Sequence, residues 1–286
     1  MAALLATTRA SRPPPVIIQP TSLHTHTFVL LHGLGNNGDR FGNELLETGL
    51  SSDGQTLNTI FPCARFVFPT AEWRRSAAFG RVRLTQWFNL SSLSDPSQRQ
   101  EIQMDGFAES ASYIRSIIAH EIETLPPGKI ILGGLSQGCA MSLLILLSLE
   151  FSLGACIGMS GWLPYRHDID DILGGVLDDI VSFGDEDESA PPDLSYQALG
   201  LIRGILSLDD INADAASAKR CLSTPLFLGH GERDEKVDCR LGDEAASTLS
   251  SLGMDVTWKR YPDLGHWYQI PGEIDDIVAF LNTTLK

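Results

Sequence analysis

The chain has 286 residues, of which 43% are hydrophobic and 20% are charged, so it can bury a core of ordinary size. Its 36 acidic and 21 basic residues give a formal net charge of −15, which argues against nucleic acid or an anionic membrane as its main partner. Its longest apolar run, residues 141–149, is shorter than the ~18 residues of a membrane span. We therefore expect a globular protein without stable membrane insertion.

The cysteine pattern predicts neither a metal centre nor a disulfide framework. None of the 5 cysteines forms a CxxC pair or a cluster with histidine at metal-ligand spacing, and they are Cys63, Cys139, Cys156, Cys221 and Cys239. Such scattered positions are typical of reduced, buried thiols, so we expect a cytoplasmic protein. Residues 1–23 lack a signal-peptide layout and are predicted to be a flexible N-terminal segment with an edge strand.

Apolar runs and helical periodicity alternate along the chain. The runs predict strands at residues 16–19, 28–31, 65–69, 129–135, 155–160, 225–229 and 256–261. The periodic apolar positions predict helices at about 99–124, 137–150, 238–252 and 272–285. Short, continuously apolar strands that alternate with helices indicate an α/β fold with a mostly parallel sheet and helices on both faces.

The alternation loosens between about residues 166 and 222. This stretch contains acidic runs, a Pro-Pro pair and weak helical periodicity at 169–180 and 196–208. We interpret it as an acidic insertion in a single domain that spans residues 24–286. Its most acidic part, residues 185–188, is predicted to be a solvated loop.

The sequence GLSQG at residues 134–138 matches the motif G-x-S-x-G. It lies between a predicted strand and a predicted helix, which is the context of a nucleophilic serine in the α/β-hydrolase fold. A turn sharp enough to expose the hydroxyl of Ser136 requires glycine two residues to either side. The start of the following helix favours the negative charge that develops during the reaction. The motif therefore predicts Ser136 as nucleophile.

A nucleophilic serine needs an imidazole as base and an acid that orients it, and in this fold they follow in the order acid, then histidine. Of the three histidines downstream, His266 is the predicted base because it follows a strand in a Gly-His turn; the others are His167 and His230. Asp234 lies just after a predicted strand and is the predicted acid. Glu232 and Asp238 remain alternatives, because the direction of a loop side chain cannot be read from sequence.

The segment HGLG at residues 32–35 follows the first central strand. An early glycine-rich loop and the residue after the nucleophile supply the oxyanion hole of this fold, so we expect the N–H groups of Leu34 and Gln137 to form it. Residues 33–38 also match G-x-G-x-x-G, a dinucleotide-binding pattern that requires an acid about 20 residues later. Asp53 has that spacing, but it is in a predicted turn instead of at a strand end.

The ordered motifs HGLG, FPT, WF, GGLSQGCAMSL, SGWLP, GHGERD and GHW resemble those of the phospholipase/carboxylesterase family, the hydrolases similar to acyl-protein thioesterases. The resemblance covers about residues 24–285 apart from the insertion. It implies a serine hydrolase that cleaves esters or thioesters without a cofactor or metal. Acting on an acylated small molecule, lysolipid or S-acylated protein, it would use Ser136, Asp234 and His266 through an acyl-serine intermediate.

The resemblance also implies an acyl site lined by Trp87, Phe88, Trp162 and Leu163. Two departures bear on the substrate: the chain has Asn89 where the family usually has aspartate, and its insertion is longer than usual. The alternative is a non-catalytic protein that binds a small ligand on the same scaffold. The complete set of serine, acid and histidine argues against that alternative.

Overall fold

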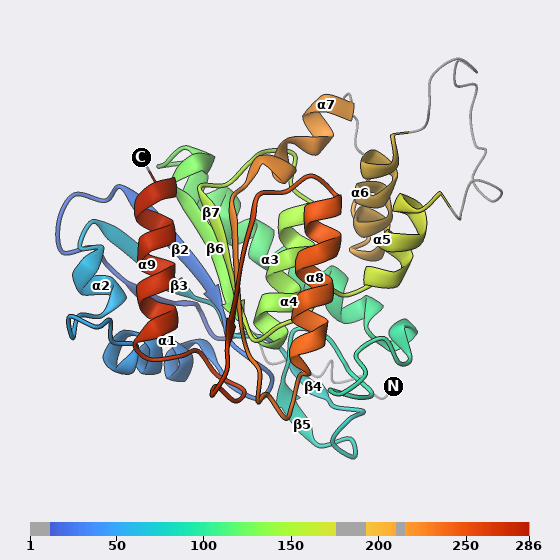
Figure 1. Cartoon of the computed structure of the whole chain (residues 1–286), viewed down its shortest axis with the longest axis horizontal. Helices are drawn as coiled ribbons and strands as arrows, with labels where there is room; N and C mark the ends of the chain where they lie inside the picture. The colour runs from blue at the N-terminus through green and yellow to red at the C-terminus, as the bar shows by residue number, and fades with distance from the viewer. Residues whose placement is uncertain (1–11, 176–192, 210–214, 286) are drawn as a thin grey trace, which may run out of the picture.

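The computed structural model describes residues 12–175, 193–209 and 215–285. Seven strands form one sheet in the order β1-β3-β2-β6-β7-β8-β9 (Figure 1). They are β1 (Val16–Ile18), β2 (His26–Leu31), β3 (Ala64–Phe68), β6 (Ile130–Leu135), β7 (Ala155–Met159), β8 (Leu226–Gly231) and β9 (Val256–Tyr261). Only the edge strand β1 is antiparallel, to β3, and every other pair in the sheet is parallel. The predicted mostly parallel sheet is confirmed.

The order of the strands places the functional loops together. After β2 the chain continues to β3 on one side of β2, and it later returns to β6 on the other side. The connections that follow β2 and β6 therefore start at adjacent strand ends and run in opposite directions across the sheet. Leu31 of β2 pairs with Gly134 of β6, and both strands end within a residue of this pair. In open α/β sheets a crevice forms at such a reversal of strand order, at the carboxyl ends of the strands.

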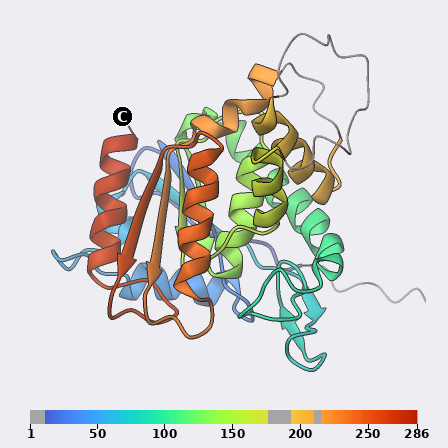
Figure 2. The same ribbon diagram turned by 45° about the vertical axis from the view of Figure 1, so that its right-hand side comes forward.

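Helices cover both faces of the sheet (Figures 1 and 2). On one face lie α1 (Gly38–Thr48) and α9 (Gly272–Thr284), and on the other lie α3 (Met104–Ile122), α4 (Gln137–Leu147) and α8 (Cys239–Ser251). Every residue of α4 is buried, because the helix packs against β6 and β7 on one side and against other helices on the other. Such a helix is apolar around its whole circumference, and its sequence shows no polar face.

The insertion contributes three short helices to the described residues, namely α5 (Arg166–Leu173), α6 (Leu194–Ile205) and α7 (Ala215–Ala218). Helix α5 packs against α6 and against α8, so the insertion is joined to the main body. The predicted helical stretches at 169–180 and 196–208 correspond to α5 and α6 in the parts that are described. The acidic residues 185–188, predicted to be a loop, lie outside the described residues.

The remaining elements are small. A hairpin of β4 (Trp73–Arg75) and β5 (Arg83–Thr85) lies apart from the main sheet (Figure 1), and α2 (Leu57–Ile60) precedes β3. Single turns of 3₁₀-helix are found at η1 (Gln100–Ile102), η2 (Pro127–Lys129) and η3 (Lys219–Ser223). No helix in the described parts of the chain is long and apolar enough to cross a bilayer.

Candidate active site

Ser136 occupies the turn between β6 and α4 in a strained conformation, with φ 57° and ψ −120°. The two flanking glycines explain how the turn is possible. A Cβ on Gly138 would lie 2.2 Å from the carbonyl oxygen of Leu31, and one on Gly134 would lie 2.6 Å from the same atom. The start of α4 therefore approaches the backbone of β2 more closely than any side chain allows. This packing accounts for both glycines of the motif.

His266 lies in the loop between β9 and α9 and faces Ser136. Its Nε2 is 2.9 Å from Ser136 Oγ, and its Nδ1 is 2.7 Å from Asp234 Oδ2. Glu273 of α9 fixes this loop, because its Oε2 accepts a hydrogen bond from the backbone N–H of Gln269. The His266 side chain keeps 14% of its surface exposed, so a substrate can approach the ring while the loop stays anchored.

The side chain of Asp234 has no exposed surface, yet both of its oxygens are hydrogen-bonded. Oδ1 accepts the backbone N–H groups of Lys236 and Val237, each at 2.9 Å, and Oδ2 lies 3.1 Å from His230 Nε2 in addition to its contact with His266. Burial alone would raise the pKa of this carboxyl. Hydrogen bonds from the two histidines and the backbone outweigh burial, so the pKa lies below its usual range and Asp234 stays ionised.

The alternatives named from the sequence lie elsewhere. Glu232 forms an ion pair with Arg260, and Asp238 accepts a hydrogen bond from the backbone of Arg240 as the N-cap of α8. His167 is exposed on α5. The structure thus brings Ser136, His266 and Asp234 together, with neither alternative acid among the hydrogen-bond partners of His266.

The glycine-rich loop after β2 lies against the nucleophile. A Cβ on Gly33 would be 3.4 Å from Ser136 Cβ. Within the described part of the chain, the N–H groups of Leu34 and Gln137 have no hydrogen-bond acceptor, whereas the next N–H along the loop, that of Gly35, donates to Thr85 O at 2.8 Å. Two free N–H groups beside a serine hydroxyl are what an oxyanion hole requires.

His32 holds this loop through hydrogen bonds of both of its ring nitrogens. The ring is fully buried, its Nδ1 lies 2.7 Å from Gly33 O, and its Nε2 accepts the backbone N–H of Ala71 at 3.0 Å. Since Nε2 accepts, the hydrogen is on Nδ1 and the ring is neutral. Burial lowers the pKa of His32 to about 4, which keeps the ring neutral across the physiological range.

Trp87 and Phe88, predicted to line the acyl site, have no exposed surface. Trp87 donates through Nε1 to His32 O at 2.8 Å. The side chain of Gln137 accepts the backbone N–H of Trp87 and donates to Phe88 O, at 2.9 and 2.8 Å. The segment of Trp87 and Phe88 therefore joins the turn after β2 to the start of α4 through hydrogen bonds, a role that the sequence did not indicate. Their contact with an acyl group stays a prediction.

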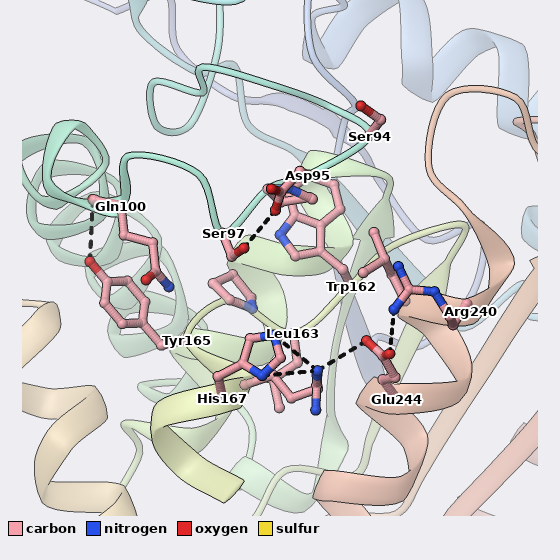
Figure 3. Close-up of a pocket in the computed structure, with 14 residues that line it drawn as sticks. Ser94, Asp95, Ser97, Gln100, Trp162, Leu163, Tyr165, His167, Arg240 and Glu244 are labelled. Carbon is pink, nitrogen blue, oxygen red and sulfur yellow. Dashed lines mark hydrogen bonds and ion pairs between the residues drawn. The ribbon is translucent and has the colours of Figure 1, made fainter. Parts of the chain in front are cut away.

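Trp162 and Leu163 line a cavity of about 420 Å³ (Figure 3). Trp162 follows Gly161, at which a Cβ would lie 3.2 Å from Ser136 O. The other walls come from the loop before α3, from the start of α5 and from α8, with Ser97, Arg166 and Glu244 among their polar side chains. One wall of the cavity thus comes from the residue after a glycine that packs against the backbone of Ser136, and the lining is mixed in polarity. The lining by Ser97 and its neighbours was not predicted.

A rival nucleophile and a rival ligand can be assessed from the same contacts. Cys139 lies one turn after Ser136, but it is fully buried, and burial raises the pKa of its thiol to about 12. In the G-x-G-x-x-G segment, Gly33 packs against Ser136, and a Cβ on Gly38 would lie 2.2 Å from Phe68 O. Gly33 is therefore explained by its contact with Ser136, and Gly38 by its contact with the end of β3. Asp53 is exposed in a turn, as expected.

A mostly parallel sheet covered by helices, with a serine on a strained strand–helix turn, defines this chain as an α/β hydrolase. The model of the phospholipase/carboxylesterase family matches residues 13–203 and 201–285. The chain belongs to that family, and the resemblance seen in the ordered motifs is confirmed. It is a serine hydrolase of carboxylic esters or thioesters.

Curated relatives and solved structures agree with this family. The acyl-protein thioesterase 1 of Gibberella zeae is 29% identical over 280 residues, which cover 96% of this chain and 97% of that protein. The protein of the same name from Debaryomyces hansenii is 25% identical over 90% of each chain. The crystal structure of Zea mays acyl-protein thioesterase 2 has a TM-score of 0.65 at 24% identity and covers 95% of this chain and 99% of that one. The Bacillus cereus carboxylesterase, with a TM-score of 0.56 at 12% identity, covers 94% and 93%. The two structures show the same fold.

Proposed function

We propose that Ser136 is the nucleophile of ester or thioester hydrolysis, that His266 is its general base and that Asp234 orients the base. The observation that carries this proposal is the unbroken series of hydrogen bonds from Ser136 Oγ through both nitrogens of His266 to Asp234 Oδ2, at 2.9 and 2.7 Å. Since Nδ1 of His266 donates to an ionised carboxylate, Nε2 is free to accept the serine proton.

In the first half of the reaction, Ser136 Oγ attacks the carbonyl carbon of the substrate while its proton passes to His266 Nε2. The N–H groups of Leu34 and Gln137 stabilise the oxyanion that forms. His266 then gives the proton to the departing alcohol or thiol, and the acyl group stays on Ser136. In the second half, His266 takes a proton from water, and the hydroxide that forms attacks the acyl-serine. As the bond between the acyl carbon and Ser136 Oγ breaks, His266 returns its proton to Ser136 Oγ, so that the carboxylic acid and free Ser136 result.

The proposed substrates are acylated small molecules, lysolipids or S-acylated proteins, because the similar proteins from Gibberella zeae and Debaryomyces hansenii are named acyl-protein thioesterases. Their acyl groups would contact Trp162 and Leu163, which line the cavity of about 420 Å³. The chemistry needs no cofactor or metal ion. A cytoplasmic location is proposed for an enzyme whose 5 cysteines are all free thiols.

Hydrolysis of p-nitrophenyl esters from acetate to palmitate by wild type and Ser136→Ala tests this function. We expect Ser136→Ala to lose turnover by about 10⁵-fold or more while keeping its fold, because no other activated nucleophile is at this position. Ser142→Ala is the matched control: this buried serine of the same helix bonds only to Gly133 O and Gly138 O, so activity should persist. Turnover retained by Ser136→Ala would refute the assignment. A fluorophosphonate probe that labels the wild type rapidly and Ser136→Ala not at all excludes the non-catalytic alternative.

A further inference from the structure

A second imidazole contacts the carboxylate that orients the base. His230 Nε2 lies 3.1 Å from Asp234 Oδ2, the same oxygen that His266 Nδ1 approaches to 2.7 Å. The other oxygen, Oδ1, is already taken by the backbone N–H groups of Lys236 and Val237. Asp234 Oδ2 is therefore shared between two rings, of which only His266 also reaches Ser136.

The neighbours of His230 determine where its hydrogen is. Nε2 lies 2.9 Å from the carbonyl oxygen of Val237 as well as 3.1 Å from Asp234 Oδ2, and both of these atoms can only accept, so Nε2 carries the hydrogen. Nδ1 is buried, has no hydrogen-bond partner in the described parts of the chain and faces Gly242, where a Cβ would lie 2.7 Å from it. A second N–H would lack an acceptor there, so these contacts fit the neutral ring.

The ring of His230 is held rigidly. It belongs to β8, has no exposed surface, and is enclosed by Gly242 of α8 and by Trp258 of β9, whose ring centroid is 6.4 Å away. The bond to Val237 O also ties the loop after β8 back onto the strand. A fixed donor of this kind can hold the carboxylate of Asp234 in one rotamer.

We propose that His230 is a positioning residue for the hydrolysis: its Nε2–H fixes Asp234 and competes with His266 for Asp234 Oδ2. The inference rests on the proposed roles of Ser136, His266 and Asp234. If this N–H is removed, the carboxylate gains freedom to rotate, and turnover falls. The negative charge of Asp234 is then also no longer shared between two N–H donors. It stabilises the protonated form of His266 more strongly, so the base becomes protonated at a higher pH.

The other charged groups near His230 are the same in the wild type and in a variant that lacks the His230 ring. Arg260 of β9 pairs with His230 in the sheet, and it is balanced by Glu232 and Asp243. Glu273 of α9 approaches Gly229 from the opposite face of the sheet. Because substitution of His230 leaves all of these groups in place, a shift in pH dependence reports the bond to Asp234.

The test compares His230→Leu, which has no donor, with His230→Gln, whose amide N–H has a similar reach. The pH profile of kcat/KM for a p-nitrophenyl ester is measured, and folded active sites are counted with a fluorophosphonate. We expect kcat of His230→Leu to fall about 10- to 100-fold with KM nearly unchanged. The midpoint of its profile should move upward by about half a pH unit or more. His230→Gln should recover most of kcat and the midpoint of the wild type.

Wild-type kcat and midpoint in His230→Leu would overturn the proposal, and so would equal losses in both variants without a shift, since these indicate packing alone. If His230→Leu does not fold, the ¹⁵N spectrum of histidine-labelled wild type at pH 7 decides. A neutral His230 with its hydrogen on Nε2 supports the proposal, and a hydrogen on Nδ1 overturns it. Ser136→Ala is assayed in parallel, because activity retained there would instead refute the proposed function.

Discussion

In the proposed reaction, Asp234 acts through its charge and its hydrogen bonds, since both of its carboxylate oxygens are bonded. In Asp234→Asn, the backbone N–H groups of Lys236 and Val237 would hold the amide oxygen, so the NH₂ group would face His266. His266 would then have to accept at Nδ1 and carry its hydrogen on Nε2, where it cannot take the serine proton. We expect kcat to fall about 10³- to 10⁴-fold, measured with a p-nitrophenyl ester.

Two matched controls separate Asp234 from the other acids of its loop. Glu232→Gln removes only a half-exposed ion pair with Arg260, and Asp238→Asn keeps a good N-cap on α8. Both should retain nearly wild-type kcat. If kcat fell in either control as much as in Asp234→Asn, the residue changed in that control would have to be considered as the acid that orients His266.

The burial of His32 makes the free energy of unfolding depend on pH in the acidic range. Burial lowers its pKa from 6.5 to about 4, so between these values the unfolded chain binds a proton that the native protein does not. The contribution is fully present above pH 6.5 and is lost as the pH falls, by about 2 kcal/mol at pH 5. Urea unfolding at pH 7.5 and pH 5 should show this loss in the wild type and a smaller one in His32→Asn. Equal losses in the two proteins would contradict this explanation.

The residues proposed for catalysis were predicted from sequence and are hydrogen-bonded to one another in the structure, but their supporting contacts were not predicted. Ser136 and His266 each lie in a short motif at the end of a predicted strand. Asp234 was separable from Glu232 and Asp238 only by the direction of its side chain, which depends on the turn of the loop. The hydrogen bonds of His32 with the backbone N–H of Ala71 and of His230 with the carbonyl oxygen of Val237 form only in the folded chain, and no pattern of adjacent residues indicates them.

At the scale of elements, the turn from β6 to α4 depends on close contact with β2. In Gly138→Ala the new Cβ would lie 2.2 Å from Leu31 O and 2.7 Å from His32 O, both rigid backbone atoms. We expect the free energy of unfolding to fall by about 3 kcal/mol and the activity to be lost with the displaced oxyanion loop. Thermal unfolding and ester hydrolysis measure the two effects.

Gly200 of α6 provides the matched helical control, because a Cβ there would contact nothing within 4 Å. Gly200→Ala should be neutral or stabilise the protein by about 0.5–1 kcal/mol. A Gly138→Ala variant as stable and active as Gly200→Ala would show that the turn tolerates a side chain.

Elements with a strong apolar pattern were predicted well, and elements made by tertiary contacts were not. All seven predicted strands of the main sheet are present. The five inner strands are largely buried apolar runs, whereas the edge strands β1 and β9 are partly exposed. The helix predicted at about residue 99 begins at Met104 instead, because Arg99 has φ 57° and a 3₁₀ turn intervenes. The β4–β5 hairpin was missed because its strands are three residues long and partly exposed.

At the scale of the whole molecule, three segments distant in sequence build the cavity that Trp162 lines (Figure 3). They are the loop around Ser97, the chain from Trp162 into α5, and the exposed end of α8. No single segment predicts such a space, because it exists only when all three have packed. Because Trp162 and Leu163 line it, we propose this cavity as the place where the acyl chain of a bound ester lies.

A bulky residue in the cavity therefore tests which substrates the enzyme accepts. Ser97→Trp fills space at the wall of the cavity, which Ser136, Asp234 and His266 do not line. We expect kcat/KM for long p-nitrophenyl esters to fall about 10-fold or more relative to acetate, so that the optimal chain becomes shorter. Ser112→Trp, at an exposed position of α3 away from this cavity, is the control and should leave the preference unchanged. If Ser97→Trp keeps the wild-type chain-length profile, the acyl chain lies elsewhere, and the cavity is left to the alcohol or thiol side of the substrate.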